Sequence, residues 1–255
     1  MSSTVALEWT FSPSDFFEIP ITICRDDYTL TIVDGKARAV IVATRFDASL
    51  GMRESLQTTL ENRFLADQLI SRRPFELSES TMVQVDADGR QQYYLNVRGI
   101  IHTQSASTLD LRVIDNDGDV TADTKQDRIR KKETFAGLVT KHQLKDQLLG
   151  SMLESFNAAI RDPQNELTHL YEIREGLAKH YGSESGARCI LAISVNDWSQ
   201  LGKICNHLPL KQGRHRGTNV ATLRDALVTE LDLARNIAQS MIEAHLKFLE
   251  NAIRS

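Results

Sequence analysis

The spacing of apolar and polar positions changes near the middle of the chain. Up to residue 122, short β-branched runs alternate with turn residues, whereas from residue 123 onward apolar residues recur at three- and four-residue intervals. The first pattern is typical of antiparallel strands and the second of amphipathic helices. The sequence therefore predicts an α+β protein, with a β-rich antiparallel domain over 1–122 and an all-α helical-bundle domain over 123–255.

The β-rich half contains paired strand signals. Residues 28–42 form two β-branched runs that meet at Asp34-Gly35, a dipeptide typical of tight hairpin turns. Residues 81–97 repeat this pattern, and a further strand is expected within 107–119. Between the hairpins, residues 49–73 carry apolar side chains at helical spacing, so one helix is expected to lie against the sheet.

The helical half divides into segments of different length. One long helix is expected from the charged stretch at 123–132 onward, and a second over 163–181. Two short helices are expected within 186–208, and a long last helix over 219–253. Because long amphipathic helices bury apolar stripes against partners, a homo-oligomer is expected.

Composition narrows the class of protein. Hydrophobic residues make up 41% and charged residues 25% of the 255 positions, as in ordinary globular proteins. No apolar run approaches the ~20 residues that span a bilayer, and the N-terminus does not resemble a secretory signal. The three cysteines (Cys24, Cys189 and Cys205) lie far apart, which favours a reduced compartment. We therefore expect a cytoplasmic protein without membrane contact.

Motifs for cofactors and metals are absent from the sequence. It contains no P-loop, no dinucleotide-binding glycine motif and no H-E-x-x-H pair. The acidic stretch at 115–119 is not a calcium loop, because Val120 and Gln126 occupy the positions that require glycine and glutamate. We expect neither a cofactor nor a bound metal.

Residues 170–182, LYEIREGLAKHYG, contain an arginine and a histidine on one predicted helix. Arg174 lies near the centre of the apolar stripe, so it is expected to point into the bundle. His180 lies about 120° around the helix and about 9 Å further along it, on the flank of the last turn. A histidine there also complements the helix C-terminus.

An inward Arg174 needs a partner, because burying an unpaired guanidinium costs several kcal/mol. Glu230 and His245 fall on the apolar stripe of the last helix, and His142 falls on that of the long helix. We expect a buried polar cluster of Arg174 and Glu230, with His142 or His245 within reach. The cluster is either an ion pair that sets the register of the helices or a catalytic or ligand-binding site.

The Arg174 and His180 pair on a helical bundle resembles the active site of HEPN (higher eukaryotes and prokaryotes nucleotide-binding) ribonucleases. The resemblance covers 123–255 and implies metal-independent RNA cleavage, with the histidine and arginine activating the ribose hydroxyl and stabilising the phosphate across a dimer. It also implies a setting in phage defence or a toxin–antitoxin pair. Glu175 follows Arg174, where family members often have Asn, Asp or His. This half also resembles helical tails of bacterial proteins, which implies a bacterial source but no activity.

The segment 185–217 concentrates positive charge. It holds five basic residues and one acidic residue, a net +4 in a chain whose net charge is −4. Its two short helices loosely resemble a helix-turn-helix, with Ala192 where the turn usually has glycine. The glycine-flanked loop that follows is expected to contact phosphate or an acidic protein, or else to pair with carboxylates of the same chain. The loop residues expected to bind are Lys211, Arg214, His215 and Arg216.

Two functions follow from these features. The first is a non-catalytic binding or regulatory protein, whose basic loop contacts nucleic acid or an acidic partner. The alternative is a HEPN-type endoribonuclease that uses Arg174 and His180. The enzyme requires both side chains to face one open groove, whereas the binding protein requires only exposed cations in the loop.

Overall fold

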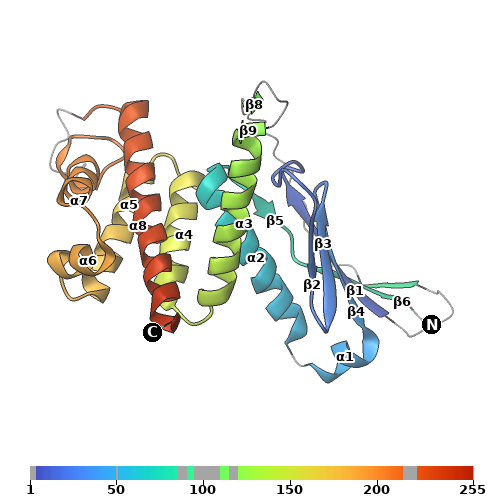
Figure 1. Cartoon of the computed structure of the whole chain (residues 1–255). Helices are drawn as coiled ribbons and strands as arrows, with labels where there is room; N and C mark the ends of the chain where they lie inside the picture. The colour runs from blue at the N-terminus through green and yellow to red at the C-terminus, as the bar shows by residue number, and fades with distance from the viewer. Residues whose placement is uncertain are drawn as a thin grey trace. The chain divides into compact units, whose positions relative to one another are not determined.

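The computed structural model describes residues 4–49, 51–85, 91–94, 110–114, 120–214 and 223–254 (Figure 1). The chain forms two compact units, a sheet unit (Met1–Phe64 and Phe75–Lys132) and a helical unit (Leu65–Pro74 and Glu133–Ser255). The α+β class is confirmed: strands dominate the first half and helices the second. Residues 65–74 also belong to the helical unit, although they lie within the β-rich half of the sequence.

The sheet unit is built on an antiparallel sheet with the order β2-β3-β4-β1-β6-β7, and β5 also pairs with β1. The predicted hairpin over 28–42 is confirmed as β3 and β4, with Val33 opposite Lys36. Both turn residues have positive φ (46° for Asp34 and 77° for Gly35), as a two-residue turn of this kind requires. The strands are β1 (Thr4–Ser12), β2 (Ile21–Cys24), β3 (Tyr28–Val33), β4 (Lys36–Val42), β5 (Glu76–Leu77), β6 (Thr81–Val85) and β7 (Gln91–Tyr94).

One face of this sheet is covered by α2 (Met52–Ser71), which follows the short α1 (Ala43–Ala48). In β4 buried and exposed residues alternate, as expected for a strand with one covered face. Trp9 Nε1 donates a hydrogen bond to Gln57 Oε1 of α2 at 2.5 Å, and the rings of Phe11 and Phe64 meet edge to face at 5.1 Å. The helix expected to lie against the sheet is therefore present.

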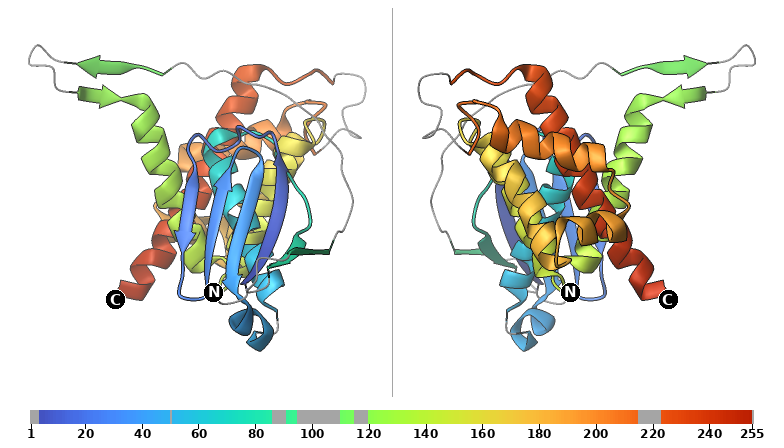
Figure 2. Two further views of the ribbon diagram at one scale, coloured as in Figure 1. Left: turned by 90° about the vertical axis from the view of Figure 1, so that its right-hand side faces the viewer. Right: turned by 90° about the vertical axis from the view of Figure 1, so that its left-hand side faces the viewer.

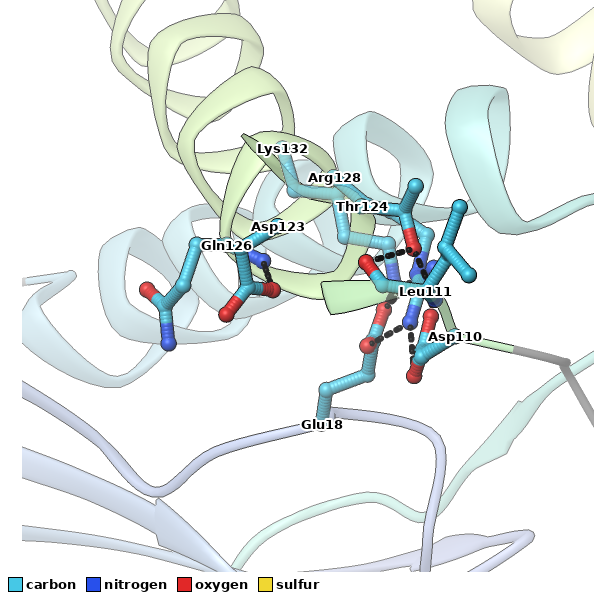
Figure 3. A network of polar contacts seen from close by, with 8 residues as sticks. All are labelled: Glu18, Asp110, Leu111, Asp123, Thr124, Gln126, Arg128 and Lys132. Carbon is cyan, nitrogen blue, oxygen red and sulfur yellow. Dashed lines mark hydrogen bonds and ion pairs between the residues drawn. The ribbon is translucent and has the colours of Figure 1, made fainter. Parts of the chain in front are cut away.

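A separate two-stranded ribbon, β8 (Arg112–Ile114) and β9 (Val120–Asp123), leads directly into α3 (Thr124–His142) (Figure 2). At the start of α3 an ion-pair network joins the helix to the loop that contains Glu18 (Figure 3). Arg128 donates to both oxygens of Glu18 at 2.8 and 2.6 Å and also pairs with Asp110 at 2.7 Å, while Lys132 Nζ donates to Glu18 at 2.8 Å.

The network holds the Glu18 carboxylate in its charged form. Burial by itself would raise the pKa of this group, but the hydrogen bonds from Arg128 and Lys132 lower it to about 2. Lys132 is buried, and its ammonium group donates to this carboxylate. The network therefore fixes the first turns of α3 within the sheet unit.

The helical unit packs its helices around one apolar core. In Figure 1 α4, α5 and α8 lie side by side, and α6 and α7 lie at one edge of this unit. Leu153, Leu177, Leu201 and Ile242 are among the buried core residues. The elements are α4 (Gln147–Arg161), α5 (Glu166–His180), α6 (Glu184–Leu191), α7 (Val195–Gly202), the π-helix η1 (Lys203–His207) and α8 (Val228–Arg254).

The single long helix expected from residue 123 is divided into α3 and α4 by a turn at 143–146. Asp146 starts α4, because its side chain accepts a hydrogen bond from the Leu149 amide at 2.7 Å. The apolar spacing continues on both sides of the turn, so spacing alone did not reveal the break.

The last helix begins at Val228 and not near residue 219. The backbone just before it is held by another segment, since the Lys211 amide donates to the Arg224 carbonyl at 2.9 Å. A helical conformation at Arg224 would remove this contact.

Three predicted features lie outside the described residues: the turn at Asp88-Gly89, the acidic stretch at 115–119, and the pair His215 and Arg216. Among the helices that are described, none combines the length and the apolar character needed to cross a bilayer.

Candidate functional site

Arg174 lies on the buried face of α5, only 9% exposed. Its guanidinium donates to the Tyr171 hydroxyl at 2.7 Å and to Glu184 Oε1 at 2.7 Å. The same group lies over the rings of Tyr171 and Trp198, at 5.1 and 5.0 Å from their centroids. Gly202 leaves the space for it, because a Cβ at this position would come within 3.3 Å of Arg174 Cζ.

The carboxylate that pairs with Arg174 is Glu184 at the start of α6, and not Glu230 as the helix phases suggested. Glu230 accepts two hydrogen bonds from Arg224, at 2.7 and 2.6 Å, and one from the Leu227 amide. Because α8 begins only at Val228, Glu230 lies in its first turn, where a carboxylate stabilises the free amides of the helix end.

The two histidines of the expected cluster lie elsewhere in the helical unit. His142 Nε2 lies 3.1 Å from Glu250 Oε2. His245 is fully buried and lies between Tyr181 and Asp146. Arg174, Glu230, His142 and His245 thus have different hydrogen-bonding partners and do not form the expected ion-paired cluster.

His245 is the centre of a hydrogen-bonded chain that the sequence did not predict. Its Nδ1 lies 2.8 Å from the Tyr181 hydroxyl and its Nε2 lies 3.2 Å from Asp146 Oδ1. These hydrogen bonds join the end of α5, the middle of α8 and the start of α4. The cap formed by Asp146 was the available signal in the sequence, but nothing there indicated its partner 99 residues away.

Burial and charge shift the pKa values along this chain. Burial lowers the pKa of His245 below its ordinary value and raises the pKa of Tyr181 to about 12. Burial alone would raise the pKa of Asp146, but hydrogen bonds from the Leu149 amide and from His245 outweigh it and lower the pKa. At neutral pH these hydrogen-bonded side chains are therefore a charged aspartate (Asp146), a neutral histidine (His245) and a neutral tyrosine (Tyr181).

His180 is exposed at the end of α5. Its ring meets those of Tyr181 and His245 edge to face, at centroid distances of 4.8 and 5.8 Å. Arg174 has a different set of neighbours, in the aromatic contacts near α7. The two residues of the expected catalytic pair thus differ in both exposure and surroundings.

The described part of the basic loop forms ion pairs with carboxylates of the same chain. Lys211 Nζ lies 2.9 Å from Asp225 Oδ2, and Arg214 Nη1 lies 2.6 Å from Glu175 Oε1. The Arg214 guanidinium also lies over the ring of Tyr171, 4.7 Å from its centroid. Both carboxylates are at least half exposed, so each ion pair is weak in water.

The two short helices α6 and α7 are joined by a tight turn. Ala192 ends α6 in the left-handed conformation, with φ of 53° and ψ of 37°. The Ser194 side chain then starts α7: its Oγ accepts from the Asp197 amide at 3.0 Å and donates to Asp197 Oδ2 at 2.7 Å. The segment is therefore a helix, a turn and a second helix, and it continues into η1.

Other chemistry is sparse in the part of the chain that the structure describes. It contains no group of three or more His, Cys, Asp or Glu side chains placed to hold a metal ion. Cys205 is buried, and burial raises the pKa of its thiol to about 12, which makes it unreactive near neutral pH.

Comparisons of the chain with protein-family models, with curated proteins and with solved structures gave no match.

Proposed function

We propose that this chain is a non-catalytic binding protein, and that the basic segment of its helical unit contacts the phosphates of a nucleic acid. One observation carries the proposal: Lys211 and Arg214 are positioned at the surface by carboxylates that are themselves exposed. Such ion pairs are weak in water, so an incoming phosphate can replace the carboxylate at little cost.

Arg214 is suited to this exchange. Its guanidinium lies over the ring of Tyr171, which fixes its plane, while Nη1 donates to the exposed carboxylate of Glu175. An arginine oriented in advance loses less side-chain entropy when it binds a phosphate through two hydrogen bonds.

The distribution of charge favours a polyanion. The segment 185–217 has a net charge of +4, whereas the remainder of the chain is acidic. Nucleic acid offers a row of phosphates and gains affinity by releasing counterions from them. An acidic protein partner would use the same cations, and the experiment below distinguishes the two because it contains nucleic acid alone.

The test is fluorescence anisotropy of labelled RNA and DNA oligonucleotides over a series of salt concentrations. Wild type is expected to bind most tightly at low salt, and Arg214→Ala is expected to weaken binding and reduce the dependence on salt. Arg161→Ala, which removes an exposed arginine of α4, is the matched control. Absence of binding by the wild type at low salt, or equal binding by Arg214→Ala, would contradict the proposal.

A HEPN-type ribonuclease is the second candidate. The exposed His180 beside the chain formed by Asp146, His245 and Tyr181 favours it, because a buried histidine that bonds both an acid and a hydroxyl can orient neighbouring groups. Its test is incubation of labelled single-stranded RNA with wild type and His180→Ala in EDTA. RNA that wild type cleaves and the variant leaves intact would favour the enzyme.

A further inference from the structure

The exposed surface of α7 and η1 carries polar side chains that take no part in the ion pairs of the loop. The two elements form one continuous helical segment, because Gly202 and Lys203 at their junction both keep right-handed helical backbone angles. One side of this segment is buried in the core through Trp198, Leu201 and Ile204. The opposite side faces solvent.

The outward side is rich in polar hydrogen-bonding groups. Asn196, Ser199, Lys203 and His207 are exposed, and Gln200 is half-buried. In α7, the spacing of Asn196, Ser199 and Gln200 by three and four residues places their side chains along one face of the helix. Val195, 64% exposed, adds one apolar group at the start.

The segment formed by α7 and η1 carries one carboxylate. Asp197 is its acidic residue, and its side chain accepts a hydrogen bond from Ser194 within the helix cap. Glu184, at the start of α6, is paired with Arg174. Apart from the capping carboxylate of Asp197, the solvent-facing side chains of α7 and η1 offer amides, a hydroxyl and a cation to a polyanion.

These side chains match the groups on the edges of base pairs. Asparagine and glutamine can form paired hydrogen bonds with adenine, lysine binds guanine, and an apolar side chain contacts the thymine methyl group. The major groove of duplex DNA is wide enough to admit one helix, and in a helix-turn-helix the second helix enters it. Here α6, the turn at Ala192 and α7 provide that arrangement of elements.

The cations of the loop lie close to the end of this helical segment. The Arg214 amide donates to the carbonyl of Cys205 in η1 at 3.1 Å, so the loop folds back onto η1. Contacts of the loop with phosphate would set the position of the helix on the duplex, while the helix face contacts the bases.

We infer that the outward face of α7 and η1 reads base pairs in the major groove of duplex DNA. The inference rests on the proposed function and names its partner and its recognition surface. Asn196 and Gln200 are central to it, because their side chains lie one helical turn apart and are bonded to each other at 3.0 Å.

The experiment is selection of bound sequences from a duplex DNA library with a randomised centre, followed by affinity measurements on the selected duplex and on RNA. It compares wild type with the double variant Asn196→Ala, Gln200→Ala. Asn251→Ala, an exposed asparagine near the end of α8, is the matched control. Melting curves verify that all variants are folded, as expected for changes at partly or fully exposed positions.

The inference predicts that wild type and the control enrich one common sequence, and that the double variant enriches none and binds it roughly tenfold or more weakly. Binding to duplex DNA without enrichment, binding to RNA alone, or an unchanged preference in the double variant would overturn the inference and leave the proposed function standing. No binding to any nucleic acid would overturn both.

Discussion

Arg174 shows how a charged residue can occupy an apolar stripe. The planar guanidinium lies over two aromatic rings and satisfies its charge with a carboxylate at the edge of the unit. Only 11% of the Arg174 side chain is exposed, whereas 59% of Glu184 is exposed. The arginine side chain is therefore buried, while the carboxylate that neutralises it stays in contact with water. This arrangement makes Arg174 a stabilising residue of the helical unit.

We expect Arg174→Ala to lower the free energy of unfolding by about 2–4 kcal/mol, since it removes a charged hydrogen bond and leaves a cavity beside Trp198. Urea unfolding followed by Trp198 fluorescence measures this loss. Lys179→Ala, an exposed change on the same helix, should alter stability by less than about 0.5 kcal/mol. Equal stability of wild type and Arg174→Ala would contradict the packing role.

His245 gives the helical unit a dependence on pH. Its pKa in the folded protein lies below the ordinary 6.5, because burial disfavours the charged ring. The unfolded chain therefore binds a proton that the folded chain does not, so the free energy of unfolding falls as the pH drops below about 6.5. The lowered pKa of Asp146 adds a further loss at more acidic pH, below its ordinary value of 3.8.

Urea unfolding at about pH 8, pH 6.5 and pH 5 would reveal this dependence. Wild type is expected to lose stability over the lower interval. His245→Gln should be less stable than wild type at the highest pH, yet change less between the two lower values. A variant with the same pH profile as wild type would show that another group is responsible.

At the scale of elements, the connection between α6 and α7 depends on backbone conformation. Ala192 adopts a left-handed conformation that residues with a Cβ disfavour by roughly 1–2 kcal/mol. The Ser194 cap and the burial of Leu191 hold the turn in place. The turn at Ala192, which would orient α7 toward DNA, is thus formed at a cost in backbone conformational energy.

We expect Ala192→Gly to raise the free energy of unfolding by about 0.5–1 kcal/mol, because glycine removes the strain but adds freedom to the unfolded chain. Ala192→Val should lower it by about 1 kcal/mol or more, since a β-branched residue strongly disfavours positive φ. Thermal melts of both variants measure the two changes. A loss of stability in Ala192→Gly would show that the methyl group has a packing role.

At the scale of the whole molecule, the units do not follow the order of the sequence. The core of the helical unit includes Ala66 and Leu69 from the end of α2. In addition Arg72, just after α2, donates to Asn236 and Gln239 of α8. The two tryptophans divide evenly, with Trp9 buried in the sheet unit and Trp198 in the helical unit.

Each tryptophan can therefore report on its own unit. We expect Leu69→Ala to cost about 2–5 kcal/mol, as a fully buried leucine does, and the loss should appear in the transition reported by Trp198 in a Trp9→Phe background. Leu144→Ala, at a leucine that is 78% exposed, is the control. A loss seen only by Trp9, in a Trp198→Phe background, would contradict the assignment of Leu69 to the helical core.

Local patterns were sufficient for much of the fold. The hairpin at Asp34-Gly35, the Ser194 cap and the apolar stripe of α5 depend on neighbours within a few residues, so they can be read in order along the chain. The same applies to the glycine after α5, since Gly182 has a φ of 79° that favours a residue without a Cβ. These features explain why the α+β class was predicted from the sequence.

The candidate site was less predictable, because it depends on contacts between distant segments. That Arg174 needs an anionic partner follows from the sequence, but the choice of Glu184 over Glu230 depends on the direction of the chain after α5 and on the late start of α8. The pairing of His245 with Asp146 requires two helices to meet at a particular rotation, which periodicity does not specify.

The sequence by itself determined the change from strands to helices, the tight turns and the concentration of positive charge in 185–217, since each is a property of neighbouring residues. The tertiary structure alone decided which carboxylate pairs with each cation, which histidines are buried, and which side of α7 faces solvent. The physical reason is that burial and ion pairing depend on distances in space, and a helix of given periodicity can present its stripe to more than one neighbour.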